Sequence, residues 1–355
     1  MKIFLVIPTL SLGGAERVMS VLANQMVLNN HVEIILLAKD EIFYPLNDKI
    51  KIHQLGFENK GKIQKIFSEI NTFFQLRKII KNNKPDVVLS FMTKYNIFVL
   101  LATIFLKVKV FVSDRCNPRR EVGFKQNFLR NILYKKAYGI IAQTQLAKEI
   151  LQKNTGNTNI KVIHNPISNI TTFPYHEREK IIVNIGRLVR IKGQEKLIES
   201  FIQLNRNDWK LIILGDGPQK NNLELKIKEL KAENNVVLMG AVKNIEEYLS
   251  KASIFVFSSL SEGFPNALAE AMISGLPCIS FDCEAGPNEI IENNVNGILV
   301  EVNNFNQLKN KIELLMDNLE LRKQLATNAS LIGEKLKEKT ITEEYLNFFN
   351  LTKNK

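Results

Sequence analysis

Two glutamates flank a turn in the stretch SEGFPNALAEAMISGLP, and both could contact a bound ligand. They are Glu262 and Glu270, and the apolar run after the turn predicts a helix over residues 265–274, with a proline at its start and a glycine after its end. Free amides at the start of a helix favour an anion. The residues that would present this backbone are Gly263, Phe264, Pro265 and Asn266.

The two carboxylates would take different positions around such an anion. Glu270 would lie inside the helix, where it could accept hydrogen bonds from a diol such as a ribose. Glu262, on the loop, would lie nearer to a group attached beyond the phosphates. The other interpretation is that Glu262 is only a favourable charge at a helix start, and the spacing of the two glutamates is by itself a weak signal.

A cationic pair lies in the stretch NIGRLVRIKGQEKLI, residues 184–198. Arg187 and Lys192 follow a predicted strand and precede a predicted helix. A guanidinium offers planar, bidentate donors and an ammonium acts as a point charge, so together they can neutralise a diphosphate. Taken alone, the stretch could equally be a solvated basic loop.

A pair of glycines lies near the start of the chain, in the stretch PTLSLGGAER. Gly13 and Gly14 separate the first predicted strand from the first predicted helix, and their missing side chains let backbone amides approach a phosphate or a sugar. The pattern is not the three-glycine dinucleotide fingerprint. A further turn, LGDGP at residues 214–218, also follows a strand and could be a plain turn.

Short apolar strands alternate with helix-like segments along the chain, which predicts parallel, doubly wound sheets. A polar stretch without periodicity interrupts the alternation. We therefore expect two Rossmann-like α/β domains, residues 1–167 and 181–335, joined by a linker over residues 168–180. A last helix within residues 336–355 would return to the first domain. Ligands would bind in the cleft between the domains, outside the carboxyl ends of the strands.

The composition is that of an ordinary globular chain, with 355 residues, 45% of them hydrophobic and 24% charged, which suits two domains. The three cysteines are odd in number and fit no zinc spacing, which favours a reducing compartment. The opening MKIFLVIPTL lacks a cleavage site and is interpreted as a buried strand. The longest apolar run, residues 97–106, is shorter than the about 20 residues that span a bilayer, so no transmembrane segment is predicted.

The net charge of +12 is unevenly distributed. Residues 1–165 contain 25 Lys and Arg against 11 Asp and Glu, a balance of +14, and the remainder contains 23 against 25, a balance of −2. A basic half indicates an anionic partner, which could be nucleic acid, a phosphorylated substrate or anionic lipid. Part of the excess could instead reflect a lysine-rich genome.

Two basic amphipathic stretches lie in this first half, at residues 60–84 and 124–136. Each mixes large apolar residues with lysines and arginines. Such helices can lie in a lipid interface, or they can pack on the sheet with a solvated lysine face. Their occurrence twice in the same half favours an anionic membrane surface as a partner.

Taken together, the motifs resemble those of glycosyltransferase family 4, whose members are retaining enzymes of the GT-B fold. The glycine pair, GRLVRIKG, LGDGP, the block SSLSEGFPNALAEAMISGLP and NGILV occur in the family's order over nearly the whole chain. This combination is highly specific. It is most similar to the subgroup that extends lipid-linked glycans in bacteria, including N-acetylgalactosamine transferases.

For catalysis, the resemblance implies that Arg187 and Lys192 hold the donor diphosphate and stabilise the charge that develops on it as it leaves. Glu262, with the backbone amides of residues 263–266, would contact the transferred sugar and the phosphate. The acceptor would attack from the face on which the phosphate leaves. That phosphate would help to take the proton, so no protein base is needed.

For donor binding, the resemblance places Glu270 at the ribose hydroxyls, Val242 near the nucleobase and Gly14 on the phosphate side. One position departs from the pattern, since many members carry a histidine near the donor sugar where this chain has Asp114 and Arg115. Related transferases carry an acidic–arginine pair there, so Arg115 is a further donor-binding candidate. None of the four histidines is expected to be catalytic.

We expect neither a metal nor a cofactor besides the UDP-sugar co-substrate, because no Asp-x-Asp follows a strand and GT-B enzymes generally act without a bound metal. The expected reaction moves a hexose or N-acetylhexosamine, with N-acetylgalactosamine favoured, from a UDP-sugar to a growing lipid-linked glycan. The glycan would be carried on a polyprenyl diphosphate, and the enzyme would act in the cytoplasm, peripherally on the inner face of the cell membrane.

Two other functions are compatible with the same fold. One is a GT-B UDP-sugar epimerase, which would need a set of carboxylates and histidines that the sequence does not offer. The other is a non-catalytic protein that binds a nucleotide or a membrane. Nucleic acid is not an expected partner, because neither a helix-turn-helix nor a basic patch interleaved with aromatic residues is evident.

Overall fold

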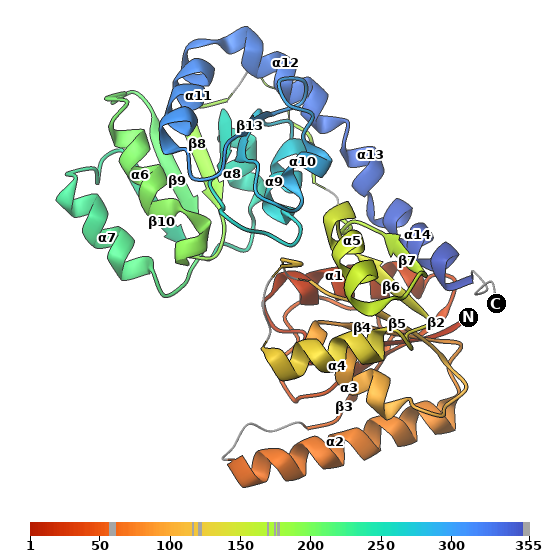
Figure 1. The fold of residues 1–355 in the computed structure, drawn as a ribbon. Helices are drawn as coiled ribbons and strands as arrows, with labels where there is room; N and C mark the ends of the chain where they lie inside the picture. Colours follow the sequence, from red (N-terminus) through yellow and green to blue (C-terminus); the bar gives the residue numbers. More distant parts are fainter. Residues whose placement is uncertain are drawn as a thin grey trace. The chain divides into compact units, whose positions relative to one another are not determined.

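The computed structural model describes residues 1–56, 62–115, 117–119, 123–168, 170–173, 175 and 178–350. The chain divides into two compact units (Figure 1). Unit 1 contains Met1–Ser168 and Leu336–Lys355, and unit 2 contains Asn169–Lys335. The chain therefore passes between the units twice.

Unit 1 is built on a parallel sheet of seven strands in the order β3-β2-β1-β4-β5-β6-β7. Its strands are β1 (Lys2–Ile7), β2 (His31–Leu36), β3 (Lys51–Gln54), β4 (Val87–Phe91), β5 (Lys109–Ser113), β6 (Gly139–Ala142) and β7 (Ile160–Val162). The inner strands are buried on both faces, as expected for parallel strands covered by helices on each side.

Helices cover both faces of this sheet. They are α1 (Gly14–Met26), α2 (Lys62–Asn83), α3 (Thr93–Ala102), α4 (Phe124–Tyr134), α5 (Gln145–Thr155) and α14 (Glu338–Asn350), with the short α13 (Gly333–Leu336) at the boundary between the units. Val110 and Val112 of β5 lie in one core cluster with side chains of α2 and α3. Phe111 of the same strand points to the other face, where its ring lies 5.2 Å from that of Phe348 and 4.8 Å from that of Phe349 in α14.

Unit 2 is built on a parallel sheet of six strands in the order β10-β9-β8-β11-β12-β13. Its strands are β8 (Ile181–Ile185), β9 (Lys210–Leu214), β10 (Val236–Gly240), β11 (Ile254–Phe257), β12 (Cys278–Phe281) and β13 (Ile298–Val300). The helices are α6 (Gln194–Ile202), α7 (Lys220–Glu229), α8 (Glu246–Lys251), α9 (Asn266–Ile273), α10 (Pro287–Ile290), α11 (Phe305–Asp317) and α12 (Leu319–Ser330). The single tryptophan, Trp209, is fully buried in the core of this unit.

The two parallel, doubly wound sheets confirm the predicted fold class. The helix expected over residues 265–274 is shorter by one residue at each end, because Pro265 precedes the first helical residue with ψ 73° and Ser274 caps the last turn. No helix among the described residues is long and apolar enough to cross a membrane.

The segment expected to be a linker, residues 168–180, forms hydrogen bonds with unit 2 through its described residues. The hydroxyl of Thr172 donates to the carbonyl oxygen of Ile273 at 2.9 Å. The guanidinium of Arg178 donates to four carbonyl oxygens, those of Phe173, Leu249, Ala252 and Ser274. Burial lowers the pKa of Arg178 to about 10. Except for that of Phe173, these carbonyl oxygens lie at the C-terminal ends of α8 and α9, where they have no partner within their own helices.

Candidate functional site

Two loops meet at the carboxyl edge of the unit 2 sheet, where parallel α/β sheets bind their ligands. Strands β8 and β11 are neighbours, so the loops that follow them, residues 186–193 and 258–265, start side by side. The backbone N–H of Leu260 donates to the carbonyl oxygen of Ile191 at 2.8 Å, and the hydroxyl of Ser258 donates to that of Lys192 at 2.8 Å. The cationic motif around Lys192 and the turn motif around Glu262 are therefore joined by hydrogen bonds at the same edge of the sheet.

Gly193 allows this close approach. Its φ of +68° lies in the left-handed region, and a Cβ atom added here would lie 2.4 Å from the carbonyl oxygen of Ser258. A side chain at this position would therefore separate the two loops.

Lys192 and Glu262 form a direct ion pair across the two loops. The ammonium donates to Oε1 of the carboxylate, and it also lies 5.4 Å from the centre of the Phe257 ring. The side chains are 21% and 12% exposed, respectively, so the pair is partly shielded but open to a ligand. Glu262 thus neutralises the charge of Lys192. The alternative interpretation, in which Glu262 is only a favourable charge at a helix start, does not account for this ion pair.

Arg187 lies on the same loop as Lys192. Its side chain is exposed, and its guanidinium forms no hydrogen bond or ion pair with any residue that the structure describes. Its carbonyl oxygen accepts a hydrogen bond of 3.4 Å from the amide of Gln194, which helps to fix the loop backbone. On this loop, Lys192 is therefore a paired cation and Arg187 is an exposed cation available to an anion.

The turn LGDGP, residues 214–218, packs directly against the arginine loop. A Cβ atom added to Gly215 would lie 2.0 Å from the carbonyl oxygen of Gly186. The N–H of Leu188 donates to the carbonyl oxygen of Asp216 at 2.9 Å. The turn therefore shapes the loop that carries Arg187, so the interpretation as a plain turn is incomplete.

The Gly-Phe-Pro-Asn turn and its helix form the next part of this edge. Phe264 is buried, and a Cβ atom added to Gly286 (φ +102°) would lie 2.4 Å from Cδ of Pro265, so the loop after β12 packs closely on the turn. Asn266 begins α9. Glu270 lies inside this helix and is only 4% exposed, a depth at which a carboxylate needs hydrogen-bond partners.

A residue that the sequence did not indicate, Cys283, lies in the loop after β12. Burial, together with the nearby Glu262 carboxylate, raises the pKa of the Cys283 thiol to about 12, so the thiol stays neutral. The pattern DCE, residues 282–284, offers no known ligand spacing. The only available signal was its position after the strand next to β11.

Val242 lies at the same edge of the sheet. It is half-buried and follows β10, whose last residue, Gly240, accepts a hydrogen bond of 2.7 Å from the N–H of Gly215. The loops that contain Val242, Gly215, Arg187 and Glu262 thus follow the neighbouring strands β10, β9, β8 and β11 in turn.

In unit 1, the glycine pair begins α1 after β1. Gly14 is the first helical residue, and Gly13 before it is extended. A Cβ atom added to Gly13 would lie 2.2 Å from Oε2 of Glu16, so the glycine leaves room for this carboxylate to fold back over the helix start. Burial raises the pKa of the Glu16 carboxyl. Hydrogen bonds from the backbone amides of Glu16 and Ala15 lower it, but by less.

Arg115 has its partners inside unit 1. Its guanidinium donates to Oδ1 of Asn165 and to the hydroxyl of Tyr345 in α14, both at 2.6 Å, and it lies 3.6 Å from the centre of the Phe91 ring. Burial lowers the pKa of Arg115. Its neighbour Asp114 accepts hydrogen bonds from Thr93, Asn96 and Tyr134. The acidic–arginine pair therefore joins the strand ends of unit 1 to the C-terminal helix.

The histidines described lie elsewhere. His31 and His53 contact the Glu33 carboxylate, at 3.0 and 2.6 Å, and the ring Nδ1 of His164 lies 2.9 Å from the carbonyl oxygen of Gln143. The fourth histidine lies outside the described residues. Within those residues, no group of three or more His, Cys, Asp and Glu side chains is arranged to hold a metal ion.

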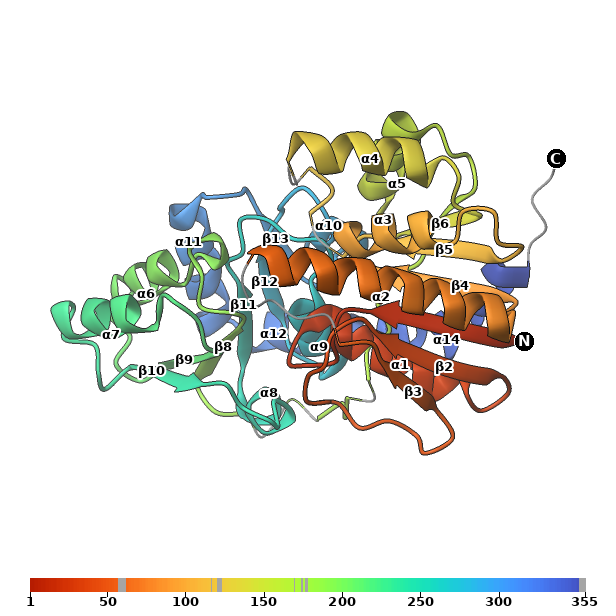
Figure 2. The ribbon, with the colours of Figure 1, turned by 90° about the horizontal axis from the view of Figure 1, so that it is seen from below.

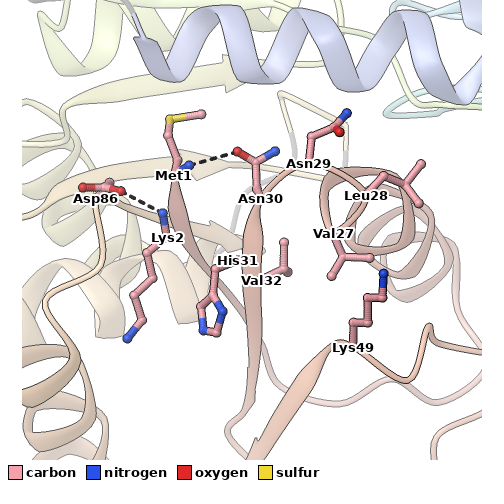
Figure 3. A pocket seen from close by; sticks show the side chains of 10 residues that line it. All are labelled: Met1, Lys2, Val27, Leu28, Asn29, Asn30, His31, Val32, Lys49 and Asp86. Atoms are coloured by element: carbon pink, nitrogen blue, oxygen red, sulfur yellow. Dashed lines mark hydrogen bonds between the residues drawn. The ribbon is translucent and has the colours of Figure 1, made fainter.

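A shallow recess of about 730 Å³ lies at the opposite, amino edge of the unit 1 sheet (Figure 3). Asp86 accepts a hydrogen bond of 2.7 Å from the N–H of Lys2, and the terminal ammonium of Met1 donates to Asn30 at 3.2 Å. Ligands of parallel α/β sheets bind at the carboxyl edge, so the loops of unit 2 are the stronger candidate.

Two family models match the chain, one in each half. The model described as Glycosyltransferase Family 4 matches residues 12–169, and that of Glycosyl transferases group 1 matches residues 170–331.

Curated relatives match over the full length. A Campylobacter jejuni enzyme named GalNAc-α-(1→4)-GalNAc-α-(1→3)-diNAcBac-PP-undecaprenol α-1,4-N-acetyl-D-galactosaminyltransferase is 30% identical over 361 residues, which cover 100% of this chain and 99% of the relative. A second C. jejuni enzyme, an N-acetylgalactosamine-N,N'-diacetylbacillosaminyl-diphospho-undecaprenol 4-α-N-acetylgalactosaminyltransferase, is 28% identical, with 98% and 99% covered.

Solved structures share the fold of the chain. Anabaena HepE in complex with UDP and glucose superposes with a TM-score of 0.85 at 19% identity, covering 99% of this chain and 100% of that one. Staphylococcus aureus TarM in complex with UDP and other ligands gives 0.83 at 18% identity, with 99% and 100% covered. The full-length relative and the paired family models agree with the motifs at the strand ends, and the chain therefore belongs to glycosyltransferase family 4 and is a glycosyltransferase of the GT-B fold.

Proposed function

We propose that the chain transfers a hexose or N-acetylhexosamine, with N-acetylgalactosamine favoured, from a UDP-sugar to a growing glycan on a polyprenyl diphosphate. The observation that carries this proposal is the Lys192–Glu262 ion pair beside the exposed Arg187 at the carboxyl edge of the unit 2 sheet. A paired and an available cation on one loop suit a diphosphate that gains negative charge as it leaves.

The roles of the side chains follow from this arrangement. Lys192 and Arg187 would bind the diphosphate and stabilise its charge in the transition state. Glu262 holds the Lys192 ammonium in place and would accept a hydrogen bond from the transferred sugar. The amides at the start of α9 would contact the phosphate or the sugar.

The remaining donor contacts would fix the nucleoside. Glu270 would bind the ribose hydroxyls and Val242 would lie near the base, with Gly14 on the phosphate side. Transfer would proceed with retention, because the leaving phosphate takes the acceptor's proton on the face from which it departs. Neither a resident metal nor a cofactor is part of this proposal.

The acceptor class is supported by the two C. jejuni relatives, whose names specify undecaprenyl-diphosphate-linked substrates. The balance of +14 in residues 1–165, from 25 basic and 11 acidic side chains, suits a diphosphate carrier and an anionic membrane. The enzyme would therefore act peripherally on the inner face of the cell membrane.

The test is a donor and acceptor screen with the purified full-length chain. A panel of UDP-sugars is incubated with undecaprenyl-diphosphate-linked oligosaccharides, and products are identified by mass spectrometry. We expect transfer from UDP-N-acetylgalactosamine by wild type. Lys192→Ala and Glu262→Ala should lower this transfer by at least about 100-fold, and Lys196→Ala, at an exposed position of α6, should leave it intact. Interconversion of UDP-sugars without an acceptor would indicate the epimerase instead, and UDP binding without turnover on any acceptor would indicate a non-catalytic protein.

A further inference from the structure

Helix α2 leaves a row of large apolar side chains in water. Four of them are between 49% and 70% exposed: Ile66, Phe67, Ile70 and Phe74. The opposite side of the helix packs on the sheet through Leu76 and Ile80, which are buried. The exposed apolar residues of α2 are therefore not part of the core of unit 1.

Helix α4 repeats this arrangement. Its exposed apolar side chains, between 40% and 86% exposed, are Phe124, Phe128, Leu129 and Ile132. Leu133 and Tyr134 on its other side are buried in the same core cluster that α2 contacts.

The two helices flank α3 on one face of the sheet (Figure 2). The ring of Phe73 in α2 lies 5.7 Å from that of Phe98 in α3, in an edge-to-face contact. Asn96 of α3 donates to the hydroxyl of Tyr134 in α4 at 2.8 Å. We call the eight exposed side chains of the two helices the α2/α4 apolar surface. They are Ile66, Phe67, Ile70, Phe74, Phe124, Phe128, Leu129 and Ile132.

Basic residues accompany this surface. Lys78 and Lys81 are exposed on α2, and Lys125 is exposed on α4, with Lys135 and Lys136 exposed directly after it. The sequence of α2 contains a single acidic residue, Glu69, and that of α4 contains none. Exposed apolar side chains and lysines on the same helices suit the interface of an anionic bilayer, which binds both.

We infer that the α2/α4 apolar surface binds the interface of an anionic lipid bilayer, with the phenylalanines of both helices inserted among the lipids. The inference rests on the proposed function, because a polyprenyl-linked acceptor is held in a bilayer. Scattered exposed apolar residues are normal on protein surfaces, whereas four large ones gathered on each of two helices that flank α3 on one face of the sheet indicate a partner. A second copy of the chain fits less well, since pairing two such surfaces would bring lysines against lysines.

The test is co-sedimentation of the full-length protein with phosphatidylcholine vesicles, with and without phosphatidylglycerol. Two double variants, Phe67→Ser/Phe74→Ser and Phe124→Ser/Phe128→Ser, probe each helix. The control, Leu225→Ser/Leu331→Ser, removes two side chains of unit 2 that are 65% and 67% exposed. Because every substituted residue is exposed, the melting temperature should stay unchanged in all three.

The expected result is that wild type binds vesicles containing phosphatidylglycerol and that each α2 or α4 variant binds at least about tenfold more weakly. The control should bind like wild type. Equal binding of all proteins, or no binding by wild type, would overturn the inference. A dimer of wild type that both helix variants dissociate would assign the surface to a second copy instead.

A second readout separates this inference from the proposed function. Transfer to a water-soluble, short-chain acceptor needs no bilayer, so the helix variants should retain wild-type rates in that assay. If the helix variants transfer at wild-type rates in solution and also bind vesicles as strongly as wild type, the membrane inference is wrong and the proposed function is unaffected. If no protein, wild type included, transfers a sugar, but the helix variants bind vesicles more weakly than wild type, the proposed function is wrong and the membrane inference is unaffected.

Discussion

Lys192 and Glu262 are joined by an ion pair that links the loops after β8 and β11. The pair belongs to two motifs separated by 70 positions in sequence, and adjacent strands bring them together. Because both side chains are largely shielded, each depends on the other for compensation of its charge. The pair is thus a fixed, polar element in the loops where the sugar nucleotide is proposed to bind.

Replacing Lys192 by alanine should lower kcat/KM for transfer by about 100-fold to 1,000-fold, the range for removing one group that stabilises developing negative charge. The reason is that the ammonium would otherwise contact the leaving diphosphate. Steady-state kinetics with the identified UDP-sugar give the value, and Lys196→Ala serves as the control. Loss below about tenfold would show that Lys192 has no role in the transition state.

Arg187→Ala should separate binding from stability. The side chain of Arg187 has no hydrogen-bond or ion-pair partner among the described residues, so the free energy of unfolding should change by less than about 0.5 kcal/mol. The affinity for UDP should nevertheless fall, by about tenfold or more, because a charge-assisted contact to phosphate is lost. Isothermal titration and chemical denaturation measure the two quantities.

The matched control for this variant is Arg190→Ala, an exposed arginine on the same loop. Equal UDP affinity for both variants would show that Arg187 is a solvated charge, as the alternative interpretation of the motif holds.

Gly215→Ala should destabilise unit 2 by about 1–3 kcal/mol, the usual cost of forcing atoms into a packed site. The added Cβ would lie 2.0 Å from the carbonyl oxygen of Gly186, so the Arg187 loop must move. Gly186→Ala is the control, because its Cβ would come no nearer than 3.5 Å to any neighbour. Denaturant unfolding compares them, and two equally stable variants would contradict the predicted clash.

The carboxylate of Glu33 should make unit 1 sensitive to acid. Burial acts to raise its pKa, but hydrogen bonds to His53 and His31 and the charge of Lys2 outweigh it, so the pKa of Glu33 is lowered on folding. A lowered pKa stabilises the folded state above the unfolded pKa of about 4.3, and this stability is lost as the pH falls through the folded value.

Glu33→Gln should therefore lower stability at pH 7 by about 1–3 kcal/mol, since a buried, hydrogen-bonded charge is replaced. The difference from wild type should shrink as the pH falls from the unfolded pKa through the lower folded pKa, below which Glu33 is protonated in wild type as well. Unfolding free energies across the acid range give this comparison. A difference that stays constant with pH would mean that the charge of Glu33 contributes nothing.

Tyr345→Phe tests the position of Arg115. Removing the hydroxyl leaves Nη2 of Arg115 without its 2.6 Å partner, and a buried unpaired donor costs about 1–3 kcal/mol. The melting temperature should fall while UDP affinity stays at the wild-type value, because the Arg115 guanidinium is bonded to Asn165 and Tyr345 within unit 1. A loss of donor affinity at unchanged stability would instead favour a direct donor contact by Arg115.

The sequence was sufficient for the fold and for most positions at the strand ends. Apolar strands such as Val87–Phe91 are short and nearly continuous, so the pattern predicted parallel sheets, and candidate ligand residues such as Arg187 follow such strands directly. The partners of Arg115 could not be predicted, because Tyr345 is 230 positions away and only the return of α14 brings it near. The close approach of Gly215 to Gly186 also depends on pairing between strands, which one-dimensional patterns do not contain.

The most direct test of the central claim compares the affinities for UDP and uridine by isothermal titration. Arg187 and Lys192 are proposed to bind the diphosphate of the donor. Wild type and Lys196→Ala should prefer UDP strongly over uridine, and Arg187→Ala/Lys192→Ala should bind the two ligands with nearly equal affinity. A double variant that keeps the wild-type preference for UDP would contradict the claim.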